Sequence, residues 1–509
     1  MTGLRRLSGL AFCFLTCLLS CLLSCLLSCV PEPETLPPDA LVVQGLNDKQ
    51  GRAFRIALTT PAALAIRCTS TTDDSEILSG QSALNSEHNL VLRGFLADTT
   101  YSCQATLTTT NEDVQSLPAV QFKTEPLPDD LEVPTLIVPG DPASVGYTLY
   151  NYAILGPFMN FYATALVIID WKGQVRWYDD EQGGADVDAH YRPGGRILFG
   201  GATPPMQTAP TLLTLDRGIL FVATSEGLSP YEDEGSYHHD VDLTATGDHL
   251  LAMTHEYLDD WQGFVLREVD LNTNTLSWSW SSIEQGVGSG ALPPGDSDTN
   301  PDPYHANAIE DLEENGETYV YVSLERTDHI LKIRKSSKQV IWQLGWDTDF
   351  TLLETDGTPA ALHRWFFGQH DLHVRHESDG LHMTFYDNGT KRADHGSPNY
   401  TRVLELLVDE GKRTARILFE YTEDGWYEPL WGGYDRFADG SGLIARAHCA
   451  VCETSPGHRS TLMQVSADGQ VTWRVEFASA DSFLYRAERI DLCAQFNVAV
   501  ESGGGCVGK

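Results

Sequence analysis

The sequence has few positive charges for its size. Its 509 residues contain 34 Lys and Arg against 71 Asp and Glu, which gives a formal net charge of −37 at pH 7. A protein of this charge repels the phosphate backbone of DNA and RNA. Functions that depend on nucleic acid are therefore excluded first, and we expect no nucleic-acid partner.

Apolar residues, in contrast, are abundant. They make up 42% of the chain, enough at this length for two or more packed domains, which excludes a disordered or fibrous protein. The 44 Gly and 25 Pro supply many tight turns, and the 11 Trp supply large core side chains. This composition favours an all-β chain over a helical one.

The N-terminal segment is apolar and begins with two arginines. Arg5 and Arg6 precede a run of mostly apolar residues that ends at Val30-Pro31-Glu32. This pattern predicts a signal peptide over residues 1–28 and export of the mature protein.

The end of the predicted signal peptide resembles a bacterial lipobox. Leu26-Leu27-Ser28 stands directly before Cys29. We expect cleavage before Cys29 and lipidation of this residue, with residues 29–39 as a tether; a retained membrane anchor is the alternative. The lipid at Cys29 would then attach a periplasmic or cell-surface lipoprotein to the membrane.

The mature chain has an even number of further cysteines but lacks a second CxxC motif. An even number in an exported protein predicts disulfides, and Cys68 with Cys103 is the natural pair of the first domain. The four others are Cys449, Cys452, Cys493 and Cys506. They allow three pairings, of which the most local joins the first two and the last two. A thiol-redox or zinc site at the single CxxC is the less favoured alternative.

Two regions follow the tether. Short alternating segments separated by turn residues predict a small antiparallel β-sandwich over residues 40–124. Tyr101 lies two residues before Cys103, a spacing that resembles the tyrosine corner of immunoglobulin and fibronectin type III domains. We interpret this module as a spacer or docking domain through which the protein could form oligomers. Proline-rich residues 125–139 are interpreted as a stiff linker.

Residues 140–509 contain a repeat. Its clearest copies each consist of a strand, a turn and a second strand that ends in a tryptophan, at Trp177, Trp278, Trp342 and Trp473. Degenerate copies between them bring the number of units to six, and a second hairpin in each unit gives four strands. Units of this length predict a six-bladed β-propeller, because a parallel β-helix has shorter and more regular repeats.

Three histidines occupy matching positions in successive units. His239, His305 and His370 follow one another at intervals of 66 and 65 residues. The inner strands of a propeller converge on a central channel, so matching residues face one another there. The three histidines are therefore candidates for a shared site in the channel.

The sequence resembles the bacterial arylsulfotransferases, which transfer a sulfuryl group between phenols without a nucleotide donor. The resemblance covers about residues 140–492, most of the chain. It rests on His238-His239-Asp240, His305-Ala306-Asn307, Ile341-Trp342-Gln343-Leu344-Gly345, Gly368-Gln369-His370-Asp371, Phe385-Tyr386-Asp387-Asn388-Gly389 and Tyr485-Arg486-Ala487-Glu488-Arg489. It implies a six-bladed propeller with a smaller β-rich N-terminal domain, export to the periplasm and an active site in the channel.

The resemblance also implies roles for individual residues. His370 would be the nucleophile that takes the sulfuryl group, with His239, His305 and Asn307 around it. Two half-reactions through a sulfohistidine would join a phenolic sulfate donor to a phenol acceptor with ping-pong kinetics. No cofactor or metal is implied. Of the adjacent His238 and His239, we expect His239 to face the channel, because it matches His370 in sequence.

One departure concerns the main cation of the site. The family usually has an arginine two residues after a serine, and here Glu325 stands at that distance from Ser323 while Arg326 is displaced by one residue. A one-residue shift turns a strand side chain to the other face, unless a bulge restores it. Arg326 is therefore the predicted cation if a bulge is present, and Arg489 or Arg392 could replace it.

Two alternative functions remain. A carboxylate from Glu325 in the channel would favour a non-catalytic surface protein that binds a ligand or a protein partner. The acidic run over residues 295–302 offers hard oxygen ligands just before His305, which would suit a metal-dependent hydrolase. A solvated acidic loop is the favoured interpretation of that run.

Overall fold

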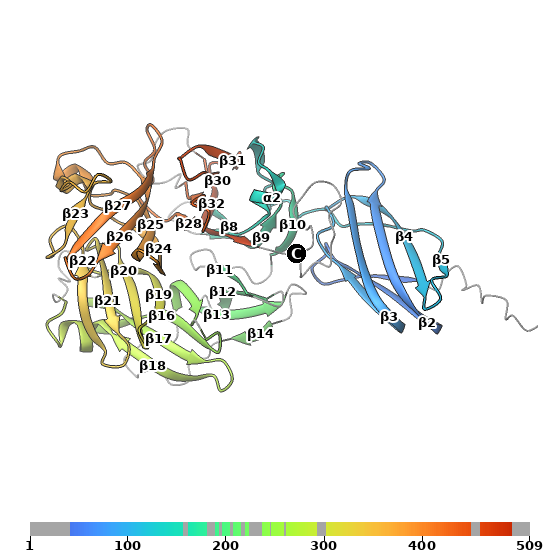
Figure 1. The fold of residues 1–509 in the computed structure, drawn as a ribbon, viewed down its shortest axis with the longest axis horizontal. Coiled ribbons are helices and arrows are strands. Elements are labelled where there is room, and N and C mark those ends of the chain that lie inside the picture. Colours follow the sequence, from blue (N-terminus) through green and yellow to red (C-terminus); the bar gives the residue numbers. More distant parts are fainter. Residues whose placement is uncertain are drawn as a thin grey trace, which may run out of the picture.

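A computed structural model of the chain (Figure 1) describes residues 41–155, 161–180, 189–192, 196–203, 207–214, 219–222, 237–244, 246–258, 261–292, 302–448 and 459–490. The predicted signal peptide and tether lie outside these residues, and so do the four C-terminal cysteines and most of the acidic run. The described part consists mainly of strands, which confirms the all-β prediction. Its helical elements are α2 (Pro142–Val145), η2 (Ser282–Val287), η3 (Leu362–Arg364) and η4 (Arg392–His395). None of the described helices is long and apolar enough to cross a membrane.

The first region forms one antiparallel network of six strands. In this region, for which the sequence predicts a small antiparallel β-sandwich, the 19-residue strand β2 pairs with β1 near its start and with β4 near its end, so hydrogen bonds link all six strands. The strands are β1 (Val42–Gly45), β2 (Arg52–Ser70), β3 (Ile77–Leu92), β4 (Thr100–Thr109), β5 (Val114–Ser116) and β6 (Val120–Lys123).

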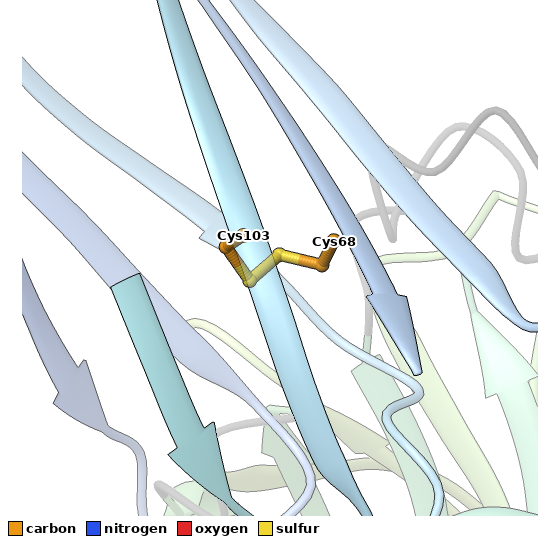
Figure 2. The surroundings of a disulfide bond; sticks show 2 residues. All are labelled: Cys68 and Cys103. Atoms are coloured by element: carbon orange, nitrogen blue, oxygen red, sulfur yellow. A yellow bond between two sulfur atoms is a disulfide. The ribbon is translucent and has the colours of Figure 1, made fainter. Parts of the chain in front are cut away.

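Two sequence predictions about this region are borne out. Cys68 and Cys103 lie directly opposite each other on β2 and β4 and form a disulfide (Figure 2). The buried Tyr101 hydroxyl accepts a hydrogen bond from the backbone N–H of Leu96 at 3.0 Å, the type of contact that defines a tyrosine corner.

Six further sheets follow among the described residues, and together they form a propeller-like array. The first sheet contains β8 (Tyr147–Leu155), β9 (Phe161–Ile169), β10 (Val175–Asp179) and the C-terminal β32 (Ser482–Ile490), which pairs with β8. The second contains β11 (Ala189–Arg192), β12 (Arg196–Thr203), β13 (Gln207–Thr214) and β14 (Ile219–Val222). The third contains β15 (Tyr237–Leu243), β16 (His249–Leu258), β17 (Trp261–Asp270) and β18 (Thr275–Ser281).

The remaining three sheets repeat this order. The fourth contains β19 (Ala306–Glu314), β20 (Glu317–Leu324), β21 (His329–Arg334) and β22 (Gln339–Leu344). The fifth contains β24 (His370–Glu377), β25 (Gly380–Asp387), β26 (Arg402–Asp409), β27 (Thr414–Tyr421) and the short β23 (Thr351–Leu353). The sixth contains β28 (Gly433–Arg436), β29 (Gly442–Arg446), β30 (Thr461–Val465), β31 (Val471–Glu476) and β7 (Thr135–Val138), a strand that we had assigned to the linker.

The repeated tryptophans connect neighbouring sheets. Trp278 on β18 donates its indole N–H to the carbonyl of Lys335, in a turn of the fourth sheet, at 3.0 Å. Trp473 on β31 donates in the same way to the carbonyl of Trp171, in a turn of the first sheet, at 2.8 Å. The spacing of tryptophans in the sequence therefore reflects one contact between each of these pairs of sheets.

Carboxylates connect the sheets at the opposite end of the strand order. Six strands are called the inner strands: β32, β11, β15, β19, β24 and β28. Each lies at one edge of its sheet and contacts the corresponding edge strand of a neighbouring sheet. An acidic side chain on one inner strand accepts the backbone N–H of the next at four junctions: Glu488 from Tyr191 (2.7 Å), Asp240 from Ile309 (2.8 Å), Glu310 from Val374, and Asp371 from Tyr434 (2.5 Å). These bonds fix the spacing of the inner strands around the predicted site.

Candidate functional site

Backbone irregularities coincide with the predicted histidines. The pairing of β15 with β16 shifts between Tyr237 and Val241, and comparable shifts occur at the start of β19 and of β24. At these points His239, His305 and Asp371 have φ values of 60°, 46° and 56°. Non-glycine residues rarely adopt this left-handed conformation, which concentrates at functional sites. The bulges re-aim side chains at matching places in three sheets.

The His370 ring is oriented by two acceptors. Its Nδ1 lies 2.8 Å from Oδ1 of Asn388 and 3.1 Å from the carbonyl oxygen of Gly368. The Asn388 amide nitrogen donates to the carbonyls of Glu428 and Trp431, so its oxygen must face the histidine. Both partners of Nδ1 are then acceptors, which places the proton on Nδ1 and leaves a lone pair on Nε2.

Burial keeps His370 neutral. Its side chain is almost completely buried, and this desolvation lowers its pKa to about 3, against the smaller opposing effect of the Asn388 hydrogen bond. The charges of His305 and Arg486 lower it further. An imidazole in this state is a nucleophile at neutral pH without needing to lose a proton.

His239 and His305 lie next to each other and close to His370. The Nε2 atoms of His239 and His305 are 3.1 Å apart, and burial, followed by the neighbouring histidines, lowers the pKa of His239 well below its usual range. His238 is also part of this group, with its Nδ1 2.6 Å from Nδ1 of His239. The structure thus brings together the three predicted histidines and adds a fourth.

Asn307 supports the backbone beside His370. Its side-chain amide nitrogen donates to the backbone carbonyl of Gln369 at 2.8 Å, and its backbone carbonyl accepts from Arg486 at 2.7 Å. The family resemblance places Asn307 around the nucleophile. The structure gives it a hydrogen bond that positions the residue preceding the nucleophile.

Arg486 is a buried cation beside His370. Its guanidinium lies 3.3 Å from Asp240 and 3.2 Å from Asp371, the same carboxylates that connect the inner strands. The pairing of β32 with β8 shifts between Leu484 and Ala487, so a bulge turns Arg486 inward. Arg486 belongs to the Tyr485-Arg486-Ala487-Glu488-Arg489 motif, but it was not among the arginines that we predicted as the cation of the site.

The arginines that were considered from the sequence have other partners. Arg326 is partly exposed and donates to the carbonyl of Asp302 at 2.5 Å, next to His305, while the Glu325 carboxylate lies beside Gly368. Arg489 on β32 and Arg392 in η4 also have other partners. Arg489 binds Thr148 and Gln464, and Arg392 binds Asp387 and the carbonyls of His363 and Trp365.

The sequence model of the arylsulfotransferase (ASST) family matches residues 152–486, which is 335 of 509 residues. The chain belongs to the arylsulfotransferase family. The four histidines, Asn307, Asn388 and Arg486 of this arylsulfotransferase fall within the matched region, whose last residue is Arg486.

The solved structures that this arylsulfotransferase is similar to share little sequence identity with it. A protein of unknown function from Bacteroides caccae is 11% identical, with a TM-score of 0.41 and coverage of 67% of this chain and 97% of its own. The periplasmic gluconolactonase PpgL of Pseudomonas aeruginosa is 10% identical, with a TM-score of 0.34 and coverage of 83% and 99%. No curated protein matches the chain.

A cavity of about 220 Å³ lies next to the buried ion pair of Arg486 and Asp371 in the arylsulfotransferase. It is lined by His190, Arg192, Asp242, Asp371, His373, Asp435, Arg486, Ala487 and Glu488. Burial raises the pKa of Asp435 to about 6, and Asp371 and Glu310 raise that of His373 well above its usual range although burial opposes them. Arg486 and Asp371 are shared between this cavity and the histidine group.

Among the described residues, one group has the spacing of a metal site, and it lies outside the acidic run. Glu377, His382 and Glu405 bring their ligand atoms within 4.8 Å of one another. Arg375 and Arg436 already form ion pairs with Glu405, so this group is balanced by cations. Asp302, the described end of the acidic run, binds His305 instead.

Proposed function

We propose that this arylsulfotransferase transfers a sulfuryl group from a phenolic sulfate ester to a phenol through a sulfohistidine at His370, without a nucleotide. The observation that carries the proposal is the orientation of the ring, since Asn388 and Gly368 hold the proton on Nδ1. A neutral imidazole with a free Nε2 lone pair is the state that attacks sulfur and later leaves.

The reaction then proceeds in two half-reactions. Nε2 of His370 attacks the sulfur of the donor, an N–S bond forms, and the bond from sulfur to the aryl oxygen breaks. The aryl oxygen takes up a proton and leaves as a phenol. In the second half-reaction an acceptor phenol gives up its proton, its oxygen attacks sulfur, and the N–S electron pair returns to Nε2.

Nearby groups support the negative charge of the sulfuryl oxygens. Arg486 is buried beside His370, and His305 is partly open to solvent, with a side chain 30% exposed. A donor entering past His305 would meet the edge of this group first. A preorganised cation and imidazole N–H groups stabilise such charge without reorganisation.

The test is covalent labelling. Wild type mixed with 4-nitrophenyl sulfate alone should gain the mass of one sulfuryl group on His370, and addition of phenol should discharge it as phenyl sulfate. His370→Ala should abolish both adduct and turnover. His249→Ala, on a histidine paired with Asp248 away from this site, is the matched control. Intact turnover in His370→Ala would refute the assignment.

A second candidate rests on Glu325. Its carboxylate beside Gly368 lies near the backbone that orients the nucleophile, where it would repel a sulfate ester. A non-catalytic surface protein that binds a ligand or protein partner accounts for that placement. Absence of any adduct in wild type, combined with saturable binding of an uncharged phenol, would favour this second function.

We also propose export and anchoring through a lipid on Cys29. The apolar segment and lipobox-like residues support this proposal. Metabolic labelling with a radioactive fatty acid should mark the wild type and fail to mark Cys29→Ser. Labelling that persists in the variant would contradict the proposal.

A further inference from the structure

The carboxylate of Asp328 lies next to the backbone that orients the nucleophile. Asp328 is in the turn between β20 and β21 of the fourth sheet, and its side chain is 3% exposed. Its Oδ1 accepts the backbone N–H of Gly368 at 2.8 Å, and its Oδ2 accepts from Nζ of Lys391 at 2.9 Å. One buried carboxylate is therefore bonded to two segments of the fifth sheet, one directly before β24 and one after β25.

These two segments carry the two acceptors of the His370 Nδ1 proton. The carbonyl oxygen of Gly368 is one acceptor, and Oδ1 of Asn388, three residues before Lys391, is the other. The imidazole is held between them, so its direction depends on how far apart the two segments lie. Because Asp328 bonds to both segments, it fixes this separation.

The backbone at both ends of the contact has a left-handed conformation. The φ values are 65° at Gly368 and 61° at Asp328. A Cβ at residue 368 would lie 2.5 Å from Oγ1 of Thr390, so this close approach requires glycine. At a non-glycine residue such as Asp328 this conformation is uncommon and persists only where the surroundings hold it. In this turn it directs the carboxylate at Gly368.

The residue that precedes the nucleophile is fixed to the same turn. Gln369 is fully buried, and its side-chain nitrogen donates to the carbonyls of Leu324 and His329 at 3.0 and 3.1 Å. These two carbonyls lie on either side of the turn that carries Asp328. The segment before the nucleophile is thus held by the fourth sheet at two consecutive residues, through the backbone of Gly368 and the side chain of Gln369.

We propose that Asp328, together with Lys391, is a positioning residue for the sulfuryl transfer. By holding Gly368 and the segment of Asn388 at a fixed separation, it keeps the proton on Nδ1 of His370 and the lone pair on Nε2. Asp328 does not touch the substrate and acts only through these groups. Its effect on the reaction rate rests on the proposed function, whereas its effect on the ring can be measured without any substrate.

Loss of the carboxylate should slow the first half-reaction. Asp328→Ala removes both contacts, and formation of the sulfo-enzyme from 4-nitrophenyl sulfate should slow by about 10²-fold, the effect of a small misplacement of a reacting group. Asp328→Asn keeps an oxygen for the Gly368 N–H, and Lys391→Met removes only the other contact, so each should slow the reaction by roughly tenfold. The Gly389 N–H still donates to the carbonyl of Phe367 at 2.7 Å, so the segments remain adjacent in these variants.

Three comparisons separate positioning from a general loss of stability. The donor concentration at half-saturation should stay unchanged, because none of these contacts involves the substrate. Lys391→Met should slow Asp328→Ala little further, since the two residues act as one unit. Asp170→Ala is the matched control: this buried carboxylate accepts the backbone N–H of Lys172 at 2.8 Å on one oxygen and pairs with Arg176 at 2.7 Å on the other. The control should lose stability and keep the rate.

The tautomer of His370 is the second readout. Nuclear magnetic resonance of protein labelled with nitrogen-15 in the histidine rings should show the proton on Nδ1 in wild type, with the signal assigned by its loss in His370→Ala. Asp328→Ala should show a mixture of both tautomers.

An unchanged tautomer in Asp328→Ala would overturn the proposal, and so would an unchanged rate in that variant or an equal loss of rate in Asp170→Ala. If wild type forms no sulfo-enzyme while the tautomer still changes in Asp328→Ala, the positioning of the ring stands and the proposed function fails.

Discussion

Replacement of Asn388 by alanine tests how the nucleophile is oriented. The substitution removes one of the two acceptors of the His370 Nδ1 proton, while the Gly368 carbonyl at 3.1 Å remains. A neutral hydrogen bond contributes about 0.5–1.5 kcal/mol. Since about 1.4 kcal/mol corresponds to a factor of ten, we expect sulfo-enzyme formation to slow by roughly three- to tenfold.

The same substitution also affects stability, and the structure separates the two effects. Asn388 donates to the carbonyls of Glu428 and Trp431, and the Glu428 carbonyl retains a second donor in Thr401 at 3.3 Å. The substitution therefore removes one hydrogen bond from each of these two buried carbonyls, at a cost of about 1–3 kcal/mol in the free energy of unfolding. Urea denaturation measures this cost independently of the reaction rate.

The assay is single-turnover formation of the sulfo-enzyme at a temperature where the variant is folded. Asn399→Ala is the control, because the side-chain amide of Asn399 makes comparable hydrogen bonds to the backbone of Thr390 and Ala393 and is not a partner of His370. It should lose stability and keep the rate. An unchanged rate in Asn388→Ala, or an equal loss of rate in the control, would refute the orientation argument.

Three further predictions concern charge, pH and the disulfide. Arg486→Met should destabilise the fold by about 3–5 kcal/mol in urea denaturation, because the buried Asp240 and Asp371 both lose their ion pair with Arg486, and Arg486→Lys should cost less. Burial lowers the pKa of His370 to about 3, so protonation of the nucleophile should not reduce single-turnover rates between pH 4 and 7. A fall in rate below about pH 6.5 whose midpoint moves when residues around His370 are substituted would contradict this expectation. Replacing both Cys68 and Cys103 by alanine should lower the free energy of unfolding of the first region by about 2–5 kcal/mol, seen as an earlier thermal transition, and an unchanged transition would contradict the role of the disulfide.

The repeat could be predicted from the sequence because one contact imposes it. Trp278 and Trp473 each donate to a carbonyl in a neighbouring sheet, and this requirement places a tryptophan on an outer strand. The alternation of apolar residues and the turn residues set the strands between them. The disulfide could be predicted for a similar reason, since Cys68 and Cys103 lie in adjacent strands of an exported-type sequence.

The position of the cation and the contact of Asp302 could not be predicted, because neither follows a regular pattern of side chains. A strict two-residue alternation assigns faces to strand side chains, and the bulge between Leu484 and Ala487 breaks it, so Arg486 faces inward although only Arg326, Arg489 and Arg392 were considered from the sequence. Asp302 stands in an acidic run with no regular period, and only the folded loop shows that it reaches His305. The positions of strands follow from the regular pattern of apolar residues, whereas the directions of the side chains in the site are set where strands depart from that pattern.

The buried charges explain how an acidic protein could accept an anionic substrate. Arg486 forms ion pairs with Asp240 and Asp371, and Asp371 also lies 3.4 Å from His373. Although burial opposes them, Asp371 and Glu310 raise the pKa of His373 well above its usual range, so this histidine is a second cation beside the carboxylates. The carboxylates that face Arg486 are therefore balanced by two cations, and the acidic character of the chain as a whole does not determine the charge next to the nucleophile. Binding of a sulfate ester would then depend on how the preorganised donors are placed rather than on the net charge of the protein.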